Sequence, residues 1–163
     1  MTTVSAARNQ KIILAARPTG EPKETDFQRI EEDIPEPGPG QVLLRTLYLS
    51  LDPYMRGRMN AGKSYAPPIA IGEVMVGGAV SQVVRSEVAG LAPGDIVEGR
   101  TGWQQYALSD GRGLRKIDPD LAPISTALGV LGMPGMTAYT GLLNIGRPRA
   151  GETVVVAAAA GAV

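Results

Sequence analysis

The residues best suited to chemistry fall in one irregular stretch of the chain. Residues 52–72 are rich in proline and glycine and show little hydrophobic periodicity, which predicts a long surface loop. Long irregular loops inside compact domains often carry function. Tyr54 follows a strong strand pattern, at a natural edge for a pocket, and its ring either borders a ligand or caps the strands. Arg56 either contacts a ligand or pairs with a local carboxylate, and Tyr65 either lines a pocket or folds back for burial alone.

Two residue types are absent from the whole sequence, which contains no cysteine and no histidine. A zinc site would have to consist of carboxylates alone, which is unusual for that metal. A Ser-His or Cys-His nucleophile is excluded within this chain, and no disulfide framework can form. We therefore expect metal-free chemistry and a cytoplasmic protein.

Composition and charge describe an ordinary soluble globular protein. Hydrophobic residues make up 44% of the 163 residues, and the formal net charge is +0. No basic excess indicates a nucleic-acid partner, and the longest apolar runs fall short of the roughly 20 residues that a membrane span needs. The first residues, MTTVSAARNQK, lack the apolar region typical of a secretory signal. We expect neither a nucleic-acid nor a membrane partner.

Glycine and proline, with 21 and 13 residues, occur at spaced breakpoints that predict a fold of short strands. The longest pattern, QVLLRTLYLSL at residues 41–51, is rich in apolar residues and flanked by turn signals. Trp103 is interpreted as a buried strand residue. The expected strands are 11–14, 27–34, 41–51, 73–86 with a bend at Gly77-Gly78, 96–97, 103–108 and 114–117. Up to about Asp118 the chain is therefore predicted to be mainly β, as a small twisted barrel or sandwich.

The pattern changes in the last third of the chain. Residues 122–131 and 134–145 are helix-like, with Pro134 suited to a first helical turn and Tyr139 expected in the core. The stretch GETVVVAAA, residues 151–159, is apolar and continuous, as in a strand buried on both faces of a parallel sheet. Together these segments predict the opening of an α/β domain.

A glycine turn follows this last predicted strand, with the sequence Ala159-Ala160-Gly161-Ala162-Val163. A strand-to-helix turn with glycine places backbone N–H groups and a helix N-terminus where a pyrophosphate binds. The usual signature is G-x-G-x-x-G, but small residues after a buried strand also occur in ordinary α/β packing, so the residues alone leave both interpretations open. The helix that would supply the dipole is absent, so the chain is expected to hold at most half of such a site.

Two segments carry a family resemblance: LSLDPYMRGRM at residues 49–59 and GMPGMTAYTGLLNIG at residues 132–146. In combination, and in the order of short strands, helices and a strand entering a glycine turn, they resemble the medium-chain dehydrogenase/reductase superfamily. The first segment is similar to its zinc-free double-bond reductases, which include leukotriene B4 dehydrogenase/prostaglandin 13-reductase, plant alkenal reductases and bacterial curcumin reductase. The resemblance covers essentially the whole chain.

This resemblance implies a domain division and an activity. Residues 1–122 would form a GroES-like substrate domain, a partly open β-barrel with short helices. Residues 123–163 would hold linking helices and the first strand of a truncated Rossmann nucleotide-binding domain, with the active site between the two. Members reduce the C=C bond of α,β-unsaturated aldehydes and ketones with NADPH, and they are commonly homodimers paired through the Rossmann domain. The residue that selects NADPH over NADH would lie roughly 20 or more residues beyond the turn, outside this chain.

The resemblance also implies roles for individual residues. The substrate would contact Tyr54, Arg56 and Tyr65. The cofactor would contact Pro53, Met133 and Thr137 near the nicotinamide, and Ala159, Gly161, Ala162 and Val163 at the pyrophosphate turn. Thr137 has the alternative of bonding its own helix backbone. Arg58 is expected to be a surface charge and Glu73 a structural carboxylate, and no catalytic residue is assigned.

Enone reduction suits a chain without metal ligands. The zinc alcohol dehydrogenases of the same superfamily place Cys and His ligands near the segments that are Asp52-Pro53-Tyr54 and Ile71-Gly72-Glu73 here, so the zinc branch is excluded. Hydride delivered to the β-carbon of an enone leaves charge on the carbonyl oxygen, which needs oriented hydrogen-bond donors more than a Lewis acid. A tyrosine hydroxyl, with an ordinary pKa of about 10, is neutral at physiological pH and can donate.

Two other functions remain open on the sequence. A quinone oxidoreductase of the same superfamily would share these motifs. Alternatively, the chain is a non-catalytic, isolated GroES-like domain, because an apolar strand at residues 154–159 without sheet neighbours favours association with a partner. The chain by itself is expected to be inactive, since most cofactor contacts would lie outside it.

Overall fold

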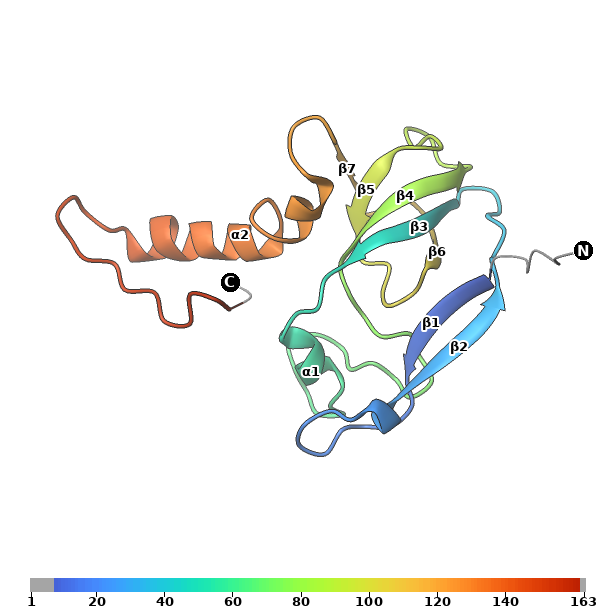
Figure 1. Cartoon of the computed structure of the whole chain (residues 1–163), viewed down its shortest axis with the longest axis horizontal. Helices are drawn as coiled ribbons and strands as arrows, with labels where there is room; N and C mark the ends of the chain where they lie inside the picture. The colour runs from blue at the N-terminus through green and yellow to red at the C-terminus, as the bar shows by residue number, and fades with distance from the viewer. Residues whose placement is uncertain (1–7, 162–163) are drawn as a thin grey trace, which may run out of the picture.

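The computed structural model describes residues 8–161, and antiparallel β-strands form most of its body (Figure 1). β1 (Arg8–Leu14) and β2 (Phe27–Asp33) form a two-stranded sheet. A five-stranded sheet has the order β6-β3-β4-β5-β7. Its strands are β3 (Val42–Leu49), β4 (Ala79–Ser86), β5 (Ile96–Gly99), β6 (Tyr106–Ser109) and β7 (Arg115–Ile117). The expectation of a mainly β chain with short helices is confirmed.

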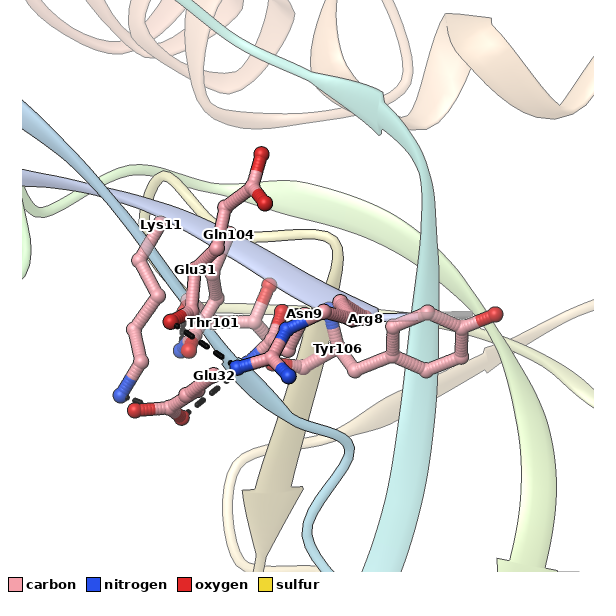
Figure 2. Close-up of polar contacts among 8 residues, drawn as sticks. All are labelled: Arg8, Asn9, Lys11, Glu31, Glu32, Thr101, Gln104 and Tyr106. Atoms are coloured by element: carbon pink, nitrogen blue, oxygen red, sulfur yellow. Dashed lines mark hydrogen bonds and ion pairs between the residues drawn. The ribbon is translucent and has the colours of Figure 1, made fainter. Parts of the chain in front are cut away.

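The two sheets meet along a seam that leaves the barrel partly open. An isolated backbone bridge pairs Lys11 with Gln104 across this seam. Beside it, Figure 2 shows the buried Asn9 side chain, whose Nδ2 donates to the Tyr106 carbonyl at 3.0 Å while its Oδ1 accepts from the Tyr106 N–H at 2.9 Å. One side-chain amide thus satisfies a backbone donor and acceptor that a continuous ladder would otherwise pair.

Two clusters of buried side chains form the core. One cluster consists of Leu14, Met59, Ile69 and Met75, and the other of Val42, Leu44, Val83 and Val97. β3 is buried on both faces at its start, since Val42, Leu43 and Leu44 are each at most 1% exposed and neighbouring side chains of a strand point to opposite faces. Full burial of such a side chain contributes about 1.5–3 kcal/mol, so β3 anchors the body from which the site is built.

The predicted strands form, in most cases with shorter ends. The strand expected at residues 41–51 ends at Leu49, and the following Ser50 N–H donates to the Gly78 carbonyl at 2.9 Å. β4 begins only at Ala79, after the predicted bend. Trp103 is not a strand residue, because Gly102 turns the chain just before it with φ of 75°. Its ring is half-buried and stacks on Phe27 with centroids 5.9 Å apart.

Short helical segments connect and extend the sheets. α1 (Tyr54–Arg58) lies within the stretch that was predicted to be a loop throughout. A 3₁₀ helix at Ile124–Leu128 is shorter than the helix predicted for residues 122–131. α2 (Met133–Tyr139) continues as a π-helical segment over Thr140–Gly146, and Pro134 lies in its first turn as expected. None of the helices within residues 8–161 is long and apolar enough to cross a membrane.

The C-terminal part of the described chain corrects two expectations. Residues 151–159 do not form the predicted strand: they pair with no other described strand, and Val154, Val155 and Val156 are 49%, 86% and 63% exposed. A strand of a parallel sheet needs strands beside it and helices over its faces, and this segment has neither among the described residues. Tyr139, expected in the core, is 61% exposed on α2, which projects away from the β body (Figure 1).

Candidate functional site

Tyr54 and Arg100 together line two hollows at one edge of the β body. The smaller hollow has a volume of about 110 Å³ and reaches Met133 at the start of α2. The larger has a volume of about 280 Å³ and is also lined by Arg58 and Thr101. We call the first the α2-side hollow and the second the arginine hollow. The two share Tyr54 and Arg100, so they adjoin at these side chains.

The packing of α1 determines where Tyr54 lies. The chain leaves β3 at Leu49 and enters α1 through Pro53, whose φ of −55° and ψ of −31° are already helical. Met55 and Met59 lie one turn apart on the same face of this segment and are 3% and 4% exposed. These two side chains bind α1 to the core, and Tyr54, the residue before the first of them, is left half-buried at the edge of both hollows.

The surroundings of Tyr54 keep its hydroxyl group protonated. Burial raises the pKa of this phenol above its ordinary value, and the negative charge of Asp52 raises it further. Arg100 and Arg58 act in the opposite direction, but the pKa remains raised. At neutral pH Tyr54 therefore presents a neutral O–H donor to the hollows. Such a donor can stabilise negative charge that develops on a substrate oxygen.

Two arginines that sequence reasoning did not assign to the site line the arginine hollow. Arg58 was expected to be a surface charge, which is wrong: it lines the hollow, and its Nε is buried without a hydrogen-bond partner among the described residues. Arg100 is the first residue after β5. Its position beside Tyr54 follows from the strand order β3-β4-β5, which brings the end of β5 near the end of β3, and no local pattern in the sequence signals this.

The structure does not show the structural alternatives that the sequence left open for Arg56 and Tyr65, namely a carboxylate pair and burial. Arg56 pairs with no carboxylate: its guanidinium donates to the carbonyl of Gly20 at 2.8 Å and to Asn60 Oδ1 at 2.7 Å, which ties α1 to the preceding loop. Tyr65 is 85% exposed, so it does not fold back for burial. Its charge when ionised would still influence the pKa of Tyr54. A substrate contact for either residue stays a prediction.

The predicted cofactor residues on α2 differ in their surroundings. Met133 lines the α2-side hollow together with Tyr54, so the structure brings a predicted cofactor residue and a predicted substrate residue to one place. Thr137 is exposed, and its Oγ1 donates to the Met133 carbonyl at 2.8 Å, the alternative that the sequence left open. Glu73 accepts the Ala70 N–H at 3.0 Å, as expected of a structural carboxylate.

The predicted pyrophosphate turn is described only in part. Ala159 and Gly161 are exposed, and the Gly161 N–H donates to the Ala158 carbonyl at 2.7 Å in a tight turn. A Cβ at Gly161 would lie 3.0 Å from that carbonyl oxygen, so the turn favours glycine. Ala162 and Val163 lie outside the described residues. In the described part of the chain no group of three or more Asp, Glu, His or Cys side chains could hold a metal ion.

Comparison with known proteins gives close relatives. Residues 10–117 match the sequence family described as the N-terminal domain of oxidoreductase. The chain is 56% identical over 156 residues to the NADPH-dependent curcumin reductase of Escherichia coli K12, covering 96% of this chain and 45% of the relative. It is 42% identical over 161 residues to the NADP(+)-dependent 2-alkenal reductase of Nicotiana tabacum, covering 95% and 47%.

A solved structure agrees with these sequence relatives. The chain superposes on CurA from Vibrio vulnificus in complex with NADPH with a TM-score of 0.88 and 54% identity, covering 94% of this chain and 45% of that one. The chain therefore spans about half the length of the relatives that it matches.

Proposed function

Because the chain belongs to the medium-chain dehydrogenase/reductase family, in the branch that contains the curcumin, alkenal and prostaglandin reductases, we propose that it is the substrate-binding part of an NADPH-dependent reductase. The reaction is reduction of the C=C bond of α,β-unsaturated aldehydes and ketones. The observation that carries this proposal is the convergence of Tyr54 and Met133 on one hollow of about 110 Å³. A neutral phenol there shares the hollow with Met133, which is expected near the nicotinamide.

The residues present fit one end of NADPH. Met133 and Pro134 line the α2-side hollow, where they would hold the nicotinamide, and Pro53 lies at the adjoining start of α1. At Gly161 a Cβ would lie 3.0 Å from the Ala158 carbonyl oxygen, so the turn favours glycine, and its exposed backbone is where the pyrophosphate would bind. NADPH, when bound, supplies the hydride for the β-carbon of the alkene.

The chain's own residues act on the substrate oxygen. Negative charge develops on the carbonyl oxygen as the β-carbon is reduced, and the O–H of Tyr54, which lines the hollow, would donate a hydrogen bond to it. The hollows would also restrict the orientation of the bound enone. This restriction lowers the entropic part of the activation barrier, because the substrate is already oriented when hydride transfer begins. Catalysis thus needs an oriented donor, and the hollow beside α1 supplies one.

The domain division belongs to the same proposal. Residues 1–122 form the substrate domain, and residues 123–163 lead into the nucleotide-binding domain. The last strand of the β body, β7, ends at Ile117, and the family match also ends there, which supports this boundary. We propose further that the complete enzyme is a cytoplasmic homodimer that pairs through the nucleotide-binding half and takes small-molecule enones and enals.

An enone assay on the full-length protein tests the proposed activity. Oxidation of NADPH is followed with cyclohexenone as substrate, and the product is identified by mass spectrometry. Formation of the saturated ketone supports the proposal. Activity only toward saturated ketones or alcohols overturns it, and a strong preference for a quinone in a parallel assay favours the quinone oxidoreductase instead.

A further inference from the structure

We propose that Arg58 and Arg100 bind a carboxylate carried by the enone substrate, so that the enzyme prefers anionic enones to their neutral esters. The inference deepens the proposed function and rests on it. It concerns the arginine hollow, which shares Tyr54 and Arg100 with the α2-side hollow but is not lined by Met133.

The lining of the arginine hollow favours an anion. Its volume is about 280 Å³, and the polar side chains around it are Tyr54, Arg58, Arg100 and Thr101. None of its lining residues is acidic, and the remaining wall includes Val74, Met75 and Val76. Two cations and two hydroxyl groups beside an apolar wall match a small organic acid, whose carboxylate accepts hydrogen bonds and whose carbon chain contacts the valines.

Two buried donor atoms at this hollow have no hydrogen-bond partner within residues 8–161. The Nε of Arg58 and the Oγ1 of Thr101 are both buried and make no hydrogen bond there. Two arginines elsewhere in the β body are paired with carboxylates: Arg115 forms an ion pair with Glu98, and Arg85 forms one with Glu36. A buried donor without a partner is costly, so a ligand that accepts from these groups removes a cost of the folded state.

The position of the acidic residues separates the two hollows. Asp52 and Glu98 line the α2-side hollow with Arg100, whereas the arginine hollow has no acidic lining residue. Met133 likewise lines only the α2-side hollow. The anion site is therefore lined by none of the α2 residues expected beside the nicotinamide, so we assign the group held there to the substrate rather than to the cofactor.

A pair of substrates measures the preference. One is an enone with a carboxylate joined to it by a short alkyl chain, and the other is its methyl ester. With the uncut protein, we expect kcat/KM for the acid to exceed that for the ester. Arg100→Met should lower kcat/KM for the acid by about 10- to 100-fold, mainly through KM, since hydrogen bonds to charged groups have this magnitude. Because Arg100 also lines the α2-side hollow, the readout is the ratio of kcat/KM for the acid to that for the ester: this ratio should fall in Arg100→Met, and Arg100→Lys should restore part of it.

A matched control and a second variant complete the design. Arg29→Met removes an exposed arginine of β2 that pairs with Glu31, and it should leave kcat/KM unchanged for both the acid and the ester. Arg58→Met tests the second cation. Because Arg58 is half-buried, a failure of that variant to fold leaves the exposed Arg100 to carry the test. Added salt should raise KM for the acid and leave the ester unaffected, because screening weakens a charged contact.

Each contrary outcome is distinct. An unchanged ratio of acid to ester in Arg100→Met overturns the inference, while reduction of the ester still upholds the proposed function. A rise in KM for NADPH with an unchanged ratio assigns the anion to the cofactor phosphates and also overturns it. If neither substrate is reduced, the proposed function fails, and calorimetry then tests the anion site separately. Binding of the acid to the wild-type protein that is lost in Arg100→Met would support the site. Absence of binding to the wild-type protein would refute it.

Discussion

Tyr54→Phe isolates the contribution of a single hydroxyl group to the proposed reaction. The pKa of Tyr54 is influenced by burial and by nearby charges but by no hydrogen bond, so the variant removes no contact that the described structure makes. Phenylalanine keeps the half-buried ring. We therefore expect the free energy of unfolding to change by less than about 0.5 kcal/mol, which makes any change in rate attributable to the lost donor.

The expected effect on the rate follows from the position of the hydroxyl. Removal of a fully enclosed oxyanion donor costs about 2.7–4 kcal/mol, and removal of an ordinary neutral hydrogen bond costs about 0.5–1.5 kcal/mol. Tyr54 is half-buried and lines two hollows, so it lies between these cases. We expect about 2 kcal/mol, which corresponds to about a 30-fold decrease in kcat.

Steady-state kinetics with a neutral enone measure this effect in the uncut protein. Because the donor acts on charge that develops in the transition state, kcat and kcat/KM should fall together. The pH profile gives an independent readout. Burial and Asp52 raise the pKa of Tyr54 above its ordinary value of 10.0, so its hydrogen bond is present throughout the neutral range and is lost only as the pH rises through that raised pKa. A kcat within twofold of wild type would refute the reasoning.

Three further predictions concern the scaffold. Asn9→Leu removes both hydrogen bonds across the seam and leaves a backbone N–H and C=O unpaired; chemical denaturation should show a loss of about 2–4 kcal/mol, and a loss below about 1 kcal/mol would contradict the role of the seam. Gly102→Ala adds a Cβ 2.7 Å from a backbone carbonyl oxygen at φ of 75° and should destabilise by at least about 1–3 kcal/mol. The matched Gly62→Ala, with open space around its Cβ, should cost less than about 1 kcal/mol; equal losses would argue against strain at the first site. A backbone N–H and the Lys116 ammonium depress the pKa of Asp95 below its ordinary value. A depressed folded pKa gives stability that is present above the unfolded pKa and lost as the pH falls through the folded one, so melting temperatures of Asp95→Asn should depend less on pH on the acid side, and parallel curves would contradict this.

Local patterns in the sequence predict the strands well because each strand carries its own signal. Residues 41–51 are rich enough in apolar side chains to predict β3, and the predicted C-terminal end lies within two residues of the observed one. α1 escapes the same reasoning because it is five residues long and contains Gly57, so no helical period can develop. Its fixed position comes instead from the burial of Met55 and Met59, which only the tertiary structure shows.

The two ends of the candidate site differ in how far the sequence predicts them. Tyr54 is identified from its loop and its family resemblance. Arg100 is not, because its place beside Tyr54 depends on β4 lying between β3 and β5. The strand predicted at residues 151–159 does not form for the opposite reason. Its apolar pattern is typical of a strand buried between neighbouring strands and covering helices, and none of the described residues supplies these neighbours.

The apolar surface of α2 bears on the geometry of the site, because Met133 lies at the start of the same helix. α2 and the π-helical segment after it present an apolar groove of about 690 Å³, lined by residues that include Met136, Tyr139 and Leu142. An apolar surface of this kind is normally a contact surface, and a partner bound there would also fix the direction of the helix. Met133, at the start of the same helix, lines the α2-side hollow. Its distance from Tyr54 would then depend on that contact. The arginine hollow has no lining residue from α2 and draws its side chains from α1 and from the segments around β4 and β5, so binding of an anion there should survive changes along α2 that impair reduction.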